Sequence, residues 1–477
     1  MTSLTQEQQA VVDYIESSEN DELVLIDAVA GSGKTHTLKS IAALFPEKRA
    51  LYMAYNKAIA VESAKKFPKH VDCKTTHSLA YRGTVIPLKL SVGFFGPRQV
   101  TDRVSYNEKH LLCEDLKEFC LSSYLTYDAY AKANGRPNAK LVNKYLTLMS
   151  QGHIECTHDF YLKLFHIMLA EGSIDQVDYE FIMLDEAGDL NEVTLEIFKL
   201  LSGRVKVAVG DPHQNIYTFN HTINCFDRLE GQGTTFKLSK SFRVPQHIAG
   251  PVEEFCQTYL NPDMQFEGIE ITDTTIKTRG YISRTNSGLI GKIIELNEDN
   301  VPYGLVRKAQ EIFKVPLMVA GLRYQGKIYD AAYKHIQDDV DDWFENKDNI
   351  KINNPTLFGY LRSKYPDDLG LKQALSLIAN HGKSAIFEAY AKAKGHESRK
   401  HDFLLLTAHS SKGLEFDEVI LAPDMTYSVD SALERIEGMP MDLIPPSEKE
   451  TFNLYYVACT RALKTLRNAT YLVTTRK

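Results

Sequence analysis

The sequence of 477 residues lacks several features, and each absence excludes a class of protein. It contains no apolar run of about 18 residues, so we expect no transmembrane helix. Its first residues carry neither a positively charged stretch nor an apolar core, which argues against a secretory leader. The seven cysteines are scattered without C-x-x-C spacing, which excludes a zinc cluster of that type and a disulfide framework. We therefore expect a cytoplasmic, nucleoid-associated protein, or a nuclear one if the host is eukaryotic.

An excess of basic residues is also missing. The formal net charge is −7, which argues against a protein that coats nucleic acid over its whole surface. The net charge does not exclude a basic channel within an otherwise acidic protein, because nucleic-acid binding depends on local charge. The hydrophobic content of 43% is ordinary for a globular protein, and the length predicts roughly two to four domains.

Two kinds of sequence alternate along the chain. Residues 1–82, 178–300 and 402–477 consist of short apolar runs followed by helical patterns, which is typical of parallel α/β sheets. Residues 85–175 and 305–400 are mainly helical in pattern and rich in charged residues and tyrosine. The simplest architecture has two sheet domains, each interrupted by a helical insertion. We expect the last strand near residues 469–473.

Residues 28–35, Ala-Val-Ala-Gly-Ser-Gly-Lys-Thr, are the most informative segment. They follow a strand-like apolar run and precede a stretch with helical spacing. A glycine-rich turn in that position directs backbone N–H groups at a phosphate, and Lys34 can reach the β- and γ-phosphates. The Thr35 hydroxyl can bind Mg²⁺. The strict pattern has glycine in place of Ala28, and the alternative is a tight turn without a ligand.

Two further strand ends carry polar residues. The apolar run 181–184 ends in Asp185 and Glu186. An acid in the first position can hold Mg²⁺ through water, and one in the second can activate the attacking water. Without a phosphate loop upstream, two solvated acids would be the better interpretation. Gln214 follows another apolar run and can sense the γ-phosphate, whereas Asp211 suits a structural turn equally well.

Arg243 and Arg461 stand where a second domain can meet the phosphates. A guanidinium group delivered across a cleft stabilises charge in the transition state and couples hydrolysis to closure. For either arginine alone, a surface ion pair is the simpler explanation.

The ordered set of motifs resembles superfamily 1 DNA helicases of the UvrD/PcrA/Rep type, and within them the F-box DNA helicase branch. The shared motifs are Gln8, the phosphate loop, Asp185-Glu186, Gln214, Arg243, residues 407–416 and Arg461. Branch features are residues 55–57, 75–78, 161–164 and 210–219. The glutamine motif begins at Leu4, so we expect no F-box before it. The chain ends soon after Arg461, so we expect no nuclease domain.

The resemblance implies an α/β fold with two RecA-like parallel-sheet P-loop motor domains, each with a mainly helical insertion. The expected boundaries are 1–84 and 176–245 for motor domain 1A, 85–175 for insertion 1B, 246–304 and 401–477 for motor domain 2A, and 305–400 for insertion 2B.

The resemblance also implies a nucleotide site for ATP and Mg²⁺. Gln8 matches the residue that recognises adenine, Phe242 matches the aromatic that stacks on the base, and Glu415 matches the glutamate near the ribose. Arg243 and Arg461 match the two arginine fingers. The expected catalytic residues are Lys34, Asp185, Glu186, Gln214, Arg243 and Arg461. The expected nucleotide-binding residues are Gln8, Ala30, Gly31, Ser32, Gly33, Lys34, Thr35, His36, Phe242, Arg243, Glu415 and Arg461, with Thr35 and Asp185 at the metal.

A single strand of DNA is expected along a path where aromatic rings stack on bases and polar groups follow phosphates. The residues that match this path are Tyr55, Asn56, Lys57, Thr76, His77, Tyr217, Phe219, Arg284, Thr285, Asn286, Thr407 and His409. For Tyr55 and Phe219 the alternative is packing in a core.

Three positions depart from the family pattern. Gly188 replaces a glutamine that connects the metal site with the γ-phosphate sensor, and Asn220 replaces an arginine. Glu450 falls where the family has an acidic pair, but Thr451 takes the second place. We expect catalysis to persist, while the coupling of hydrolysis to movement is in question.

The expected activity is ATP-driven translocation on single-stranded DNA and DNA unwinding, with 3′→5′ travel implied by the resemblance alone. Repair, recombination or replication are the expected processes. We expect a monomer that binds single strands and their junctions with duplex, with a single-strand-binding or recombinase partner and no membrane. The alternatives are a translocase that strips proteins from DNA, a non-catalytic DNA-binding scaffold with a degraded motor, and a P-loop kinase or small-molecule NTPase.

Overall fold

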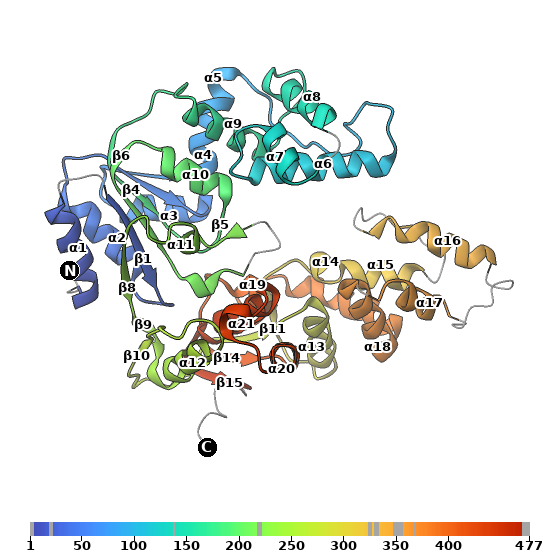
Figure 1. Cartoon of the computed structure of the whole chain (residues 1–477). Coiled ribbons are helices and arrows are strands. Elements are labelled where there is room, and N and C mark those ends of the chain that lie inside the picture. Colours follow the sequence, from blue (N-terminus) through green and yellow to red (C-terminus); the bar gives the residue numbers. More distant parts are fainter. Residues whose placement is uncertain are drawn as a thin grey trace. The chain divides into compact units, whose positions relative to one another are not determined.

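The computed structural model divides the chain into two compact units (Figure 1). Unit 1 comprises residues 1–243 and 264–267, and unit 2 comprises residues 244–263 and 268–477. The structure describes residues 4–18, 22–136, 139–216, 222–322, 327–328, 333–346, 356–366 and 368–469.

Unit 1 is built on a six-stranded sheet with the order β3-β2-β4-β6-β1-β8. All its pairings are parallel. The strands are β1 (Glu22–Ala28), β2 (Ala50–Ala54), β3 (Val71–Thr75), β4 (Tyr179–Leu184), β6 (Gly203–Gly210) and β8 (Thr234–Leu238). Because the carboxyl ends of parallel strands meet at one edge, the loops after these strands gather there.

Side chains on alternate positions of β1 pack into two different cores. Val24 and Ile26 pack with α1 (Gln6–Ser17), α2 (Lys34–Leu44) and α3 (Lys57–Lys66). Leu25 faces the second core, which includes α10 (Glu192–Leu200). Successive side chains of a strand point to opposite faces of the sheet. Because helices cover both faces here, the side chains on both faces of β1 are apolar.

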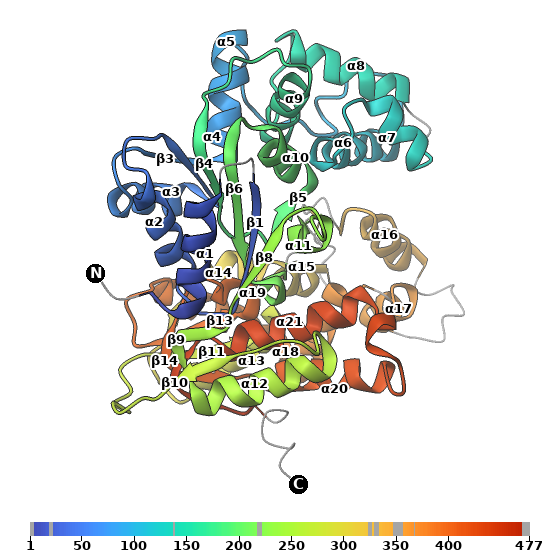
Figure 2. The same cartoon turned by 60° about the vertical axis from the view of Figure 1, so that its left-hand side comes forward.

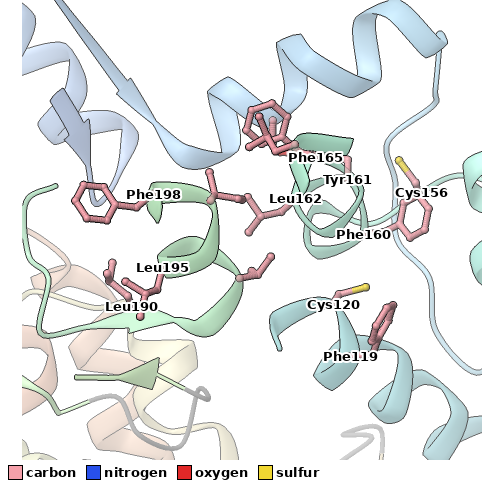
Figure 3. Packing of buried hydrophobic residues seen from close by; sticks show 14 of the residues in the cluster. Phe119, Cys120, Cys156, Phe160, Tyr161, Leu162, Phe165, Leu190, Leu195 and Phe198 are labelled. Atoms are coloured by element: carbon pink, nitrogen blue, oxygen red, sulfur yellow. The ribbon is translucent and has the colours of Figure 1, made fainter. Parts of the chain in front are cut away.

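A helical insertion lies between β3 and β4. It contains α4 (Thr76–Ala80), a π-helix (Tyr81–Val85), α5 (Ile86–Leu88), α6 (Tyr106–Leu121), α7 (Tyr127–Ala133), α8 (Ala139–Ser150) and α9 (His158–Ala170). Figure 3 shows buried side chains between α6, α9 and α10, among them Phe119, Leu162 and Phe198. These contacts join the insertion to the sheet through α10.

Unit 2 is built on a five-stranded parallel sheet with the order β12-β13-β11-β14-β15. The strands are β11 (Arg279–Ser283), β12 (Gly304–Leu305), β13 (Phe403–Thr407), β14 (Phe416–Leu421) and β15 (Ala462–Arg467). The helices α12 (Gln246–Tyr259), α20 (Pro423–Arg435) and α21 (Pro446–Cys459) pack together beside it (Figure 2).

A second helical insertion lies between β12 and β13. It contains α14 (Ala309–Ile312), α15 (Lys314–Leu322), α16 (Ile336–Asn346), α17 (Leu357–Lys364) and α18 (Leu369–Ala393). α18 is kinked at Gly382, whose φ of 76° interrupts the helix. The helix α13 (Asn286–Glu298) and α18 share one apolar core with the sheet.

The fold class predicted from the sequence is confirmed, since both units carry parallel sheets flanked by helices. The strand expected near residues 469–473 falls almost wholly outside the described residues, and Ala469 is not in a strand. The edge strand β15 lies earlier, at residues 462–467, and its side chains are mostly half-buried. An edge strand of this kind carries no continuous apolar run, so the sequence pattern did not reveal it. No helix among the described residues is long and apolar enough to cross a membrane.

Candidate functional site

The glycine-rich segment joins β1 to α2, as the sequence predicts. Gly31 and Gly33 adopt φ values of 76° and 82°, a region that side-chain-bearing residues rarely occupy. Gly33 stands at the N-cap of α2, where no side chain accepts a hydrogen bond from the first turn. The N–H groups of a helix start of this kind are suited to bind an anion, and Lys34 and Thr35 are the first two residues of the helix.

Gln8 lies against this segment. Its Nε2 donates to the carbonyl oxygen of Ser32 at 3.3 Å, and its side chain is also part of the capping box that begins α1. The residue is 1% exposed, so its amide is held in one orientation. Ser32 is buried as well, and among the described residues its Oγ has no hydrogen-bond partner.

The stretch after β8 runs along the other side of the phosphate loop. Ser241 Oγ donates to the carbonyl oxygen of Ala30 at 2.8 Å, and the Phe242 N–H donates to that of Gly31 at 2.9 Å. The Phe242 ring is half exposed, which leaves a face free to stack on a base.

The loop glycines also permit a close approach that any other residue would prevent. A Cβ on Gly31 would lie 2.6 Å from the Cβ of Arg243, and one on Gly33 would lie 2.9 Å from Nε2 of Gln8. Arg243 is thus in unit 1, beside the phosphate loop, which agrees with the expected boundary of motor domain 1A at residue 245 and not with delivery from a second domain. The reason is that the chain passes the loop once more after β8, before it enters unit 2.

Asp185 follows β4 and is held through both carboxylate oxygens. Tyr52 of β2 donates its hydroxyl to Oδ2 at 2.5 Å, and the Glu186 N–H donates to Oδ1 at 2.9 Å. Burial raises the pKa of Asp185, and the neighbouring Glu186 raises it further, whereas Tyr52 and Lys34 oppose the shift. Lys34 is therefore close enough to act on this carboxylate.

Glu186 has a backbone φ of 55°, the left-handed region that glycine favours. Such a conformation costs about 1–3 kcal/mol in a non-glycine residue and persists where its surroundings impose it. Here the carbonyl oxygen of Glu186 accepts from the Asp189 N–H at 3.1 Å, which closes a tight turn. The main chain of the residue expected to activate water is thus held in a tight turn.

The loops after β4 and β6 touch backbone to backbone. The Ala187 N–H donates to the carbonyl oxygen of Val209 at 3.0 Å. A Cβ on Gly188 would lie 2.7 Å from the carbonyl oxygen of Asp211, and one on Gly210 would lie 2.8 Å from the Gly188 nitrogen. Gly188 is therefore required by the packing, because no side chain fits there. In the next turn, Gln214 donates from Nε2 to Oδ2 of Asp211 at 2.7 Å.

Asp27 belongs to the same site, although no sequence motif indicated it. Burial raises its pKa to about 6, Asp211 raises it too, and Lys237 and Lys34 oppose the shift. The signal that could have found it is its place directly before the phosphate loop, at the end of β1.

The donor set fits a nucleoside triphosphate with Mg²⁺. Thr35 and Asp185 offer a hydroxyl and a carboxylate, which are ligands that Mg²⁺ accepts. Among the described residues, no group of three or more His, Cys, Asp or Glu could hold a metal by itself. Mg²⁺ in proteins commonly takes its remaining ligands from substrate phosphates and water.

A pocket of about 340 Å³ opens at the ends of β2, β3 and β4. Tyr55, Thr76 and His77, all expected on the strand path, line it. Asp185 lines it as well, so one carboxylate belongs both to this pocket and to the phosphate site. Tyr55 is 47% exposed and does not pack in a core.

The structure also places three further features of the expected DNA path, at His77, Asn56 and Lys57. Burial lowers the pKa of His77, whose ring meets that of Tyr161 edge-on at 5.9 Å. Asn56 caps α3, since its Oδ1 accepts from the Ile59 N–H at 2.9 Å. Lys57 is the exposed first residue of that helix. Tyr217, Phe219 and Asn220 lie outside the described residues.

A second group of expected residues gathers in unit 2. Ser283 at the end of β11 pairs in register with Thr407 at the end of β13, so Arg284, Thr285, Asn286 and His409 follow neighbouring strand ends. Thr285 caps α13, and Thr407 caps α19 (Ala408–Ser411).

Charged residues of unit 2 lie close to Arg284. Burial lowers the pKa of Arg284, and Glu450 and Asp424 oppose the shift. Glu450, which falls where the family has an acidic pair, is thus near this arginine. Arg461 lies in the turn between α21 and β15, and its Nε donates to the carbonyl oxygen of Val457 at 2.9 Å. Glu415 precedes β14 in the same unit. The roles of Glu415 and Arg461 at the nucleotide remain predictions.

Comparison with known proteins agrees with the motif order. Residues 8–220 match the model of an AAA domain, and residues 293–471 match that of the UvrD-like helicase C-terminal domain. The chain is 27% identical to F-box DNA helicase 1 of Gallus gallus, over 97% of its own length and 48% of that protein. It is 25% identical to F-box DNA helicase protein 1 of Schizosaccharomyces pombe, over 97% of its own length and 57% of that protein. The chain thus spans about half the length of these relatives. With a phosphate loop, an Asp-Glu strand end and two parallel sheets in the expected order, the chain belongs to the UvrD-like superfamily 1 helicases.

Proposed function

We propose that the chain is an ATP-driven motor that moves along single-stranded DNA and unwinds duplex. The observation that carries this proposal is the double position of Asp185. It lies within the electrostatic reach of Lys34 and also lines the pocket with Tyr55 and His77. We call this pocket the strand pocket, because we propose that it holds single-stranded DNA. A change at the phosphates can therefore reach the strand pocket through one short loop.

The residues of unit 1 account for the chemistry of hydrolysis. Gln8 and the ring of Phe242 would hold the base, and the N–H groups at the start of α2 would hold the phosphates. Mg²⁺, held by Thr35 and Asp185, would supply charge neutralisation at the β- and γ-phosphates. Glu186 would take the proton of the attacking water, and Arg243 would stabilise the charge that develops. In this proposal Arg461 adds a second guanidinium group from unit 2.

The strand pocket accounts for binding without sequence preference. An aromatic ring stacks on any base, and this contact contributes about 1–3 kcal/mol per base. Tyr55 offers such a ring, and Thr76 and His77 offer polar contacts beside it. Travel in the 3′→5′ direction, a role in repair, recombination or replication, action as a monomer and a nuclear or nucleoid location complete the proposal.

The decisive experiment measures ATPase and unwinding on 3′-tailed, 5′-tailed and blunt duplexes, with RNA as a control. We expect stimulation by single-stranded DNA and unwinding of the 3′-tailed substrate. Stimulation without unwinding, together with displacement of a bound protein, would favour a translocase that strips proteins from DNA. Tight strand binding without hydrolysis would indicate a scaffold, and the absence of any stimulation would indicate another P-loop enzyme.

Two substitutions test the residue assignment. Lys34→Ala and Glu186→Gln should each leave a folded protein that has lost DNA-stimulated ATPase, because one removes a phosphate contact and the other the base. Circular dichroism checks the fold of each variant. Stimulated turnover that persists in both variants would refute the site.

A further inference from the structure

The turn that follows β11 is tied to a carboxylate more than a hundred positions away in the chain. Arg284 and Thr285 of this turn donate their backbone N–H groups to Asp424, at 3.1 and 2.9 Å. The hydroxyls of Ser283 and Thr285 also contact its carboxylate, each at 2.8 Å. Four donors from three consecutive residues therefore converge on one side chain, and charge-assisted bonds of this kind are the strong ones.

Thr285 continues this link into α13. Its hydroxyl donates to Asp424 and accepts from the Gly288 N–H at 3.0 Å. The cap of α13 and the start of α20 are thus joined through one hydroxyl. Asp424 itself lies in the first turn of α20, where a negative charge is favourable.

The space around the carboxylate is filled. A Cβ on Gly288 would lie 2.3 Å from Oγ of Ser283 and 2.5 Å from Oδ2 of Asp424. On the same helix, a Cβ on Gly291 would meet nothing within 4 Å. Because the atoms around Gly288 are so close, Ser283 and the carboxylate of Asp424 have little room to move there.

Asp424 also stands at a junction in the sheet of unit 2. It follows β14 almost directly, and β14 begins next to Glu415, the residue expected near the ribose. β14 pairs with β11, and the Ala422 N–H donates to the carbonyl oxygen of Ile282 at 2.9 Å. The carboxylate of Asp424 therefore ties the turn after β11 to the segment that follows β14, the strand next to Glu415.

We propose that Asp424 is the positioning residue of the strand-contacting turn 283–286, holding Arg284, Thr285 and Asn286 in the geometry that grips DNA. The inference rests on the proposed function, since only a DNA-binding protein needs this turn for that purpose. Asp424 acts through the turn and does not itself contact the strand.

The test uses two variants and two matched controls in the full chain. Asp424→Asn removes the charge, and Gly288→Ala forces the carboxylate and Ser283 apart. Asp430→Asn removes an exposed charge from the same helix α20, and Gly291→Ala adds the same methyl group on α13 where there is room. Each protein is measured for hydrogen exchange at residues 284–285 without DNA, for affinity to a thymidine oligonucleotide, and for ATP affinity.

We expect both test variants to exchange the amides of residues 284–285 faster than the wild type. Their affinity for the oligonucleotide should fall by about tenfold, which corresponds to the loss of one charge-assisted hydrogen bond. ATP affinity should not change, and both controls should behave as the wild type.

Three outcomes would overturn the inference. The first is that Asp424→Asn leaves the hydrogen exchange at residues 284–285 unchanged. The second is that a variant with faster exchange binds the oligonucleotide as tightly as the wild type. The third is that ATP affinity falls in parallel with affinity for the oligonucleotide. Failure of the proposed function is distinguishable, because then the wild type itself binds no oligonucleotide. The exchange measurement would still decide in that case whether Asp424 positions the turn.

Discussion

At the residue scale, the important contacts join side chains that lie far apart in the sequence. Tyr52 and Asp185 are separated by 133 positions, yet the hydroxyl of one donates to the carboxylate of the other. Tyr52 is fully buried and Asp185 nearly so, so water cannot replace this bond. Burial and the nearby Asp185 raise the pKa of Tyr52 well above its usual range, which keeps the hydroxyl protonated as a donor.

Replacing Tyr52 with phenylalanine should weaken the use of Mg²⁺. Without its hydroxyl partner, Asp185 is less well oriented, and the Mg²⁺ concentration for half-maximal ATPase should rise by about tenfold. Tyr179→Phe is the matched control, because its hydroxyl donates to Asp72, at 3.3 Å, at the far end of β4. An unchanged Mg²⁺ requirement in Tyr52→Phe would contradict the assigned role.

His166 should make the stability of unit 1 sensitive to acid. Burial lowers its pKa to about 4, and the nearby Lys163 lowers it too. The folded state therefore binds fewer protons than the unfolded state between about pH 6.5 and pH 4, and stability is lost as the pH falls through this range. At pH 5 the loss reaches at most about 2 kcal/mol relative to pH 7.

The variant His166→Gln should lose less stability between pH 7 and pH 5 than the wild type does. Denaturant unfolding at both pH values measures the difference. His153→Gln, at an exposed position, is the control. Equal losses in His166→Gln and the wild type would show that His166 is not held neutral in the fold.

At the scale of elements, two loops at the edge of the first sheet meet through their backbones. Gly188 and Gly210 have no space for a side chain, because each faces the backbone of the other loop. The family pattern has a glutamine in place of Gly188, and from the sequence this departure suggested weakened coupling. The structure gives a physical reason for the glycine instead.

Gly188→Ala should therefore damage the protein although alanine is the smallest change possible. Its methyl group would lie 2.7 Å from the carbonyl oxygen of Asp211, so the loop after β6 must shift. We expect a loss of about 1–3 kcal/mol in stability and a larger relative loss in DNA-stimulated than in unstimulated ATPase. Thermal unfolding and ATPase assays measure both effects.

Gly321→Ala is the control for this substitution, since a methyl group there meets nothing within 4 Å. If Gly188→Ala retained full stimulation and stability, the backbone contact between the two loops would not be needed.

At the scale of the whole molecule, the acidic net charge limits how DNA is held. The expected strand path includes only two permanent cations, Lys57 and Arg284, while the chain carries a net charge of −7. For single strands, each phosphate contact contributes about −0.7 to the slope of log affinity against log salt.

We therefore expect a slope between about −1 and −3 for binding to a thymidine oligonucleotide. Fluorescence anisotropy across a series of salt concentrations measures it, and Lys57→Ala should make the slope shallower by about 0.7. A slope steeper than about −5 would show that the phosphates are neutralised by cations outside the predicted path.

The sequence by itself determined the fold class, the phosphate loop, the Asp-Glu strand end and the family. These signals are local, because each depends on the order of neighbouring residues along one strand, turn or helix. Of the residues expected on the path of the DNA strand, Tyr55, Thr76 and His77 line one pocket, and Tyr217 and Phe219 lie outside the described residues.

Tertiary structure alone decided which distant residues meet. It placed Arg243 beside the phosphate loop in unit 1, brought Tyr52 and Asp27 to the site, and set Asp424 against the turn after β11. The physical reason is that parallel sheets order their strands differently from the chain, so strand ends that meet at one edge can be more than a hundred residues apart. No local pattern records which of these ends become neighbours.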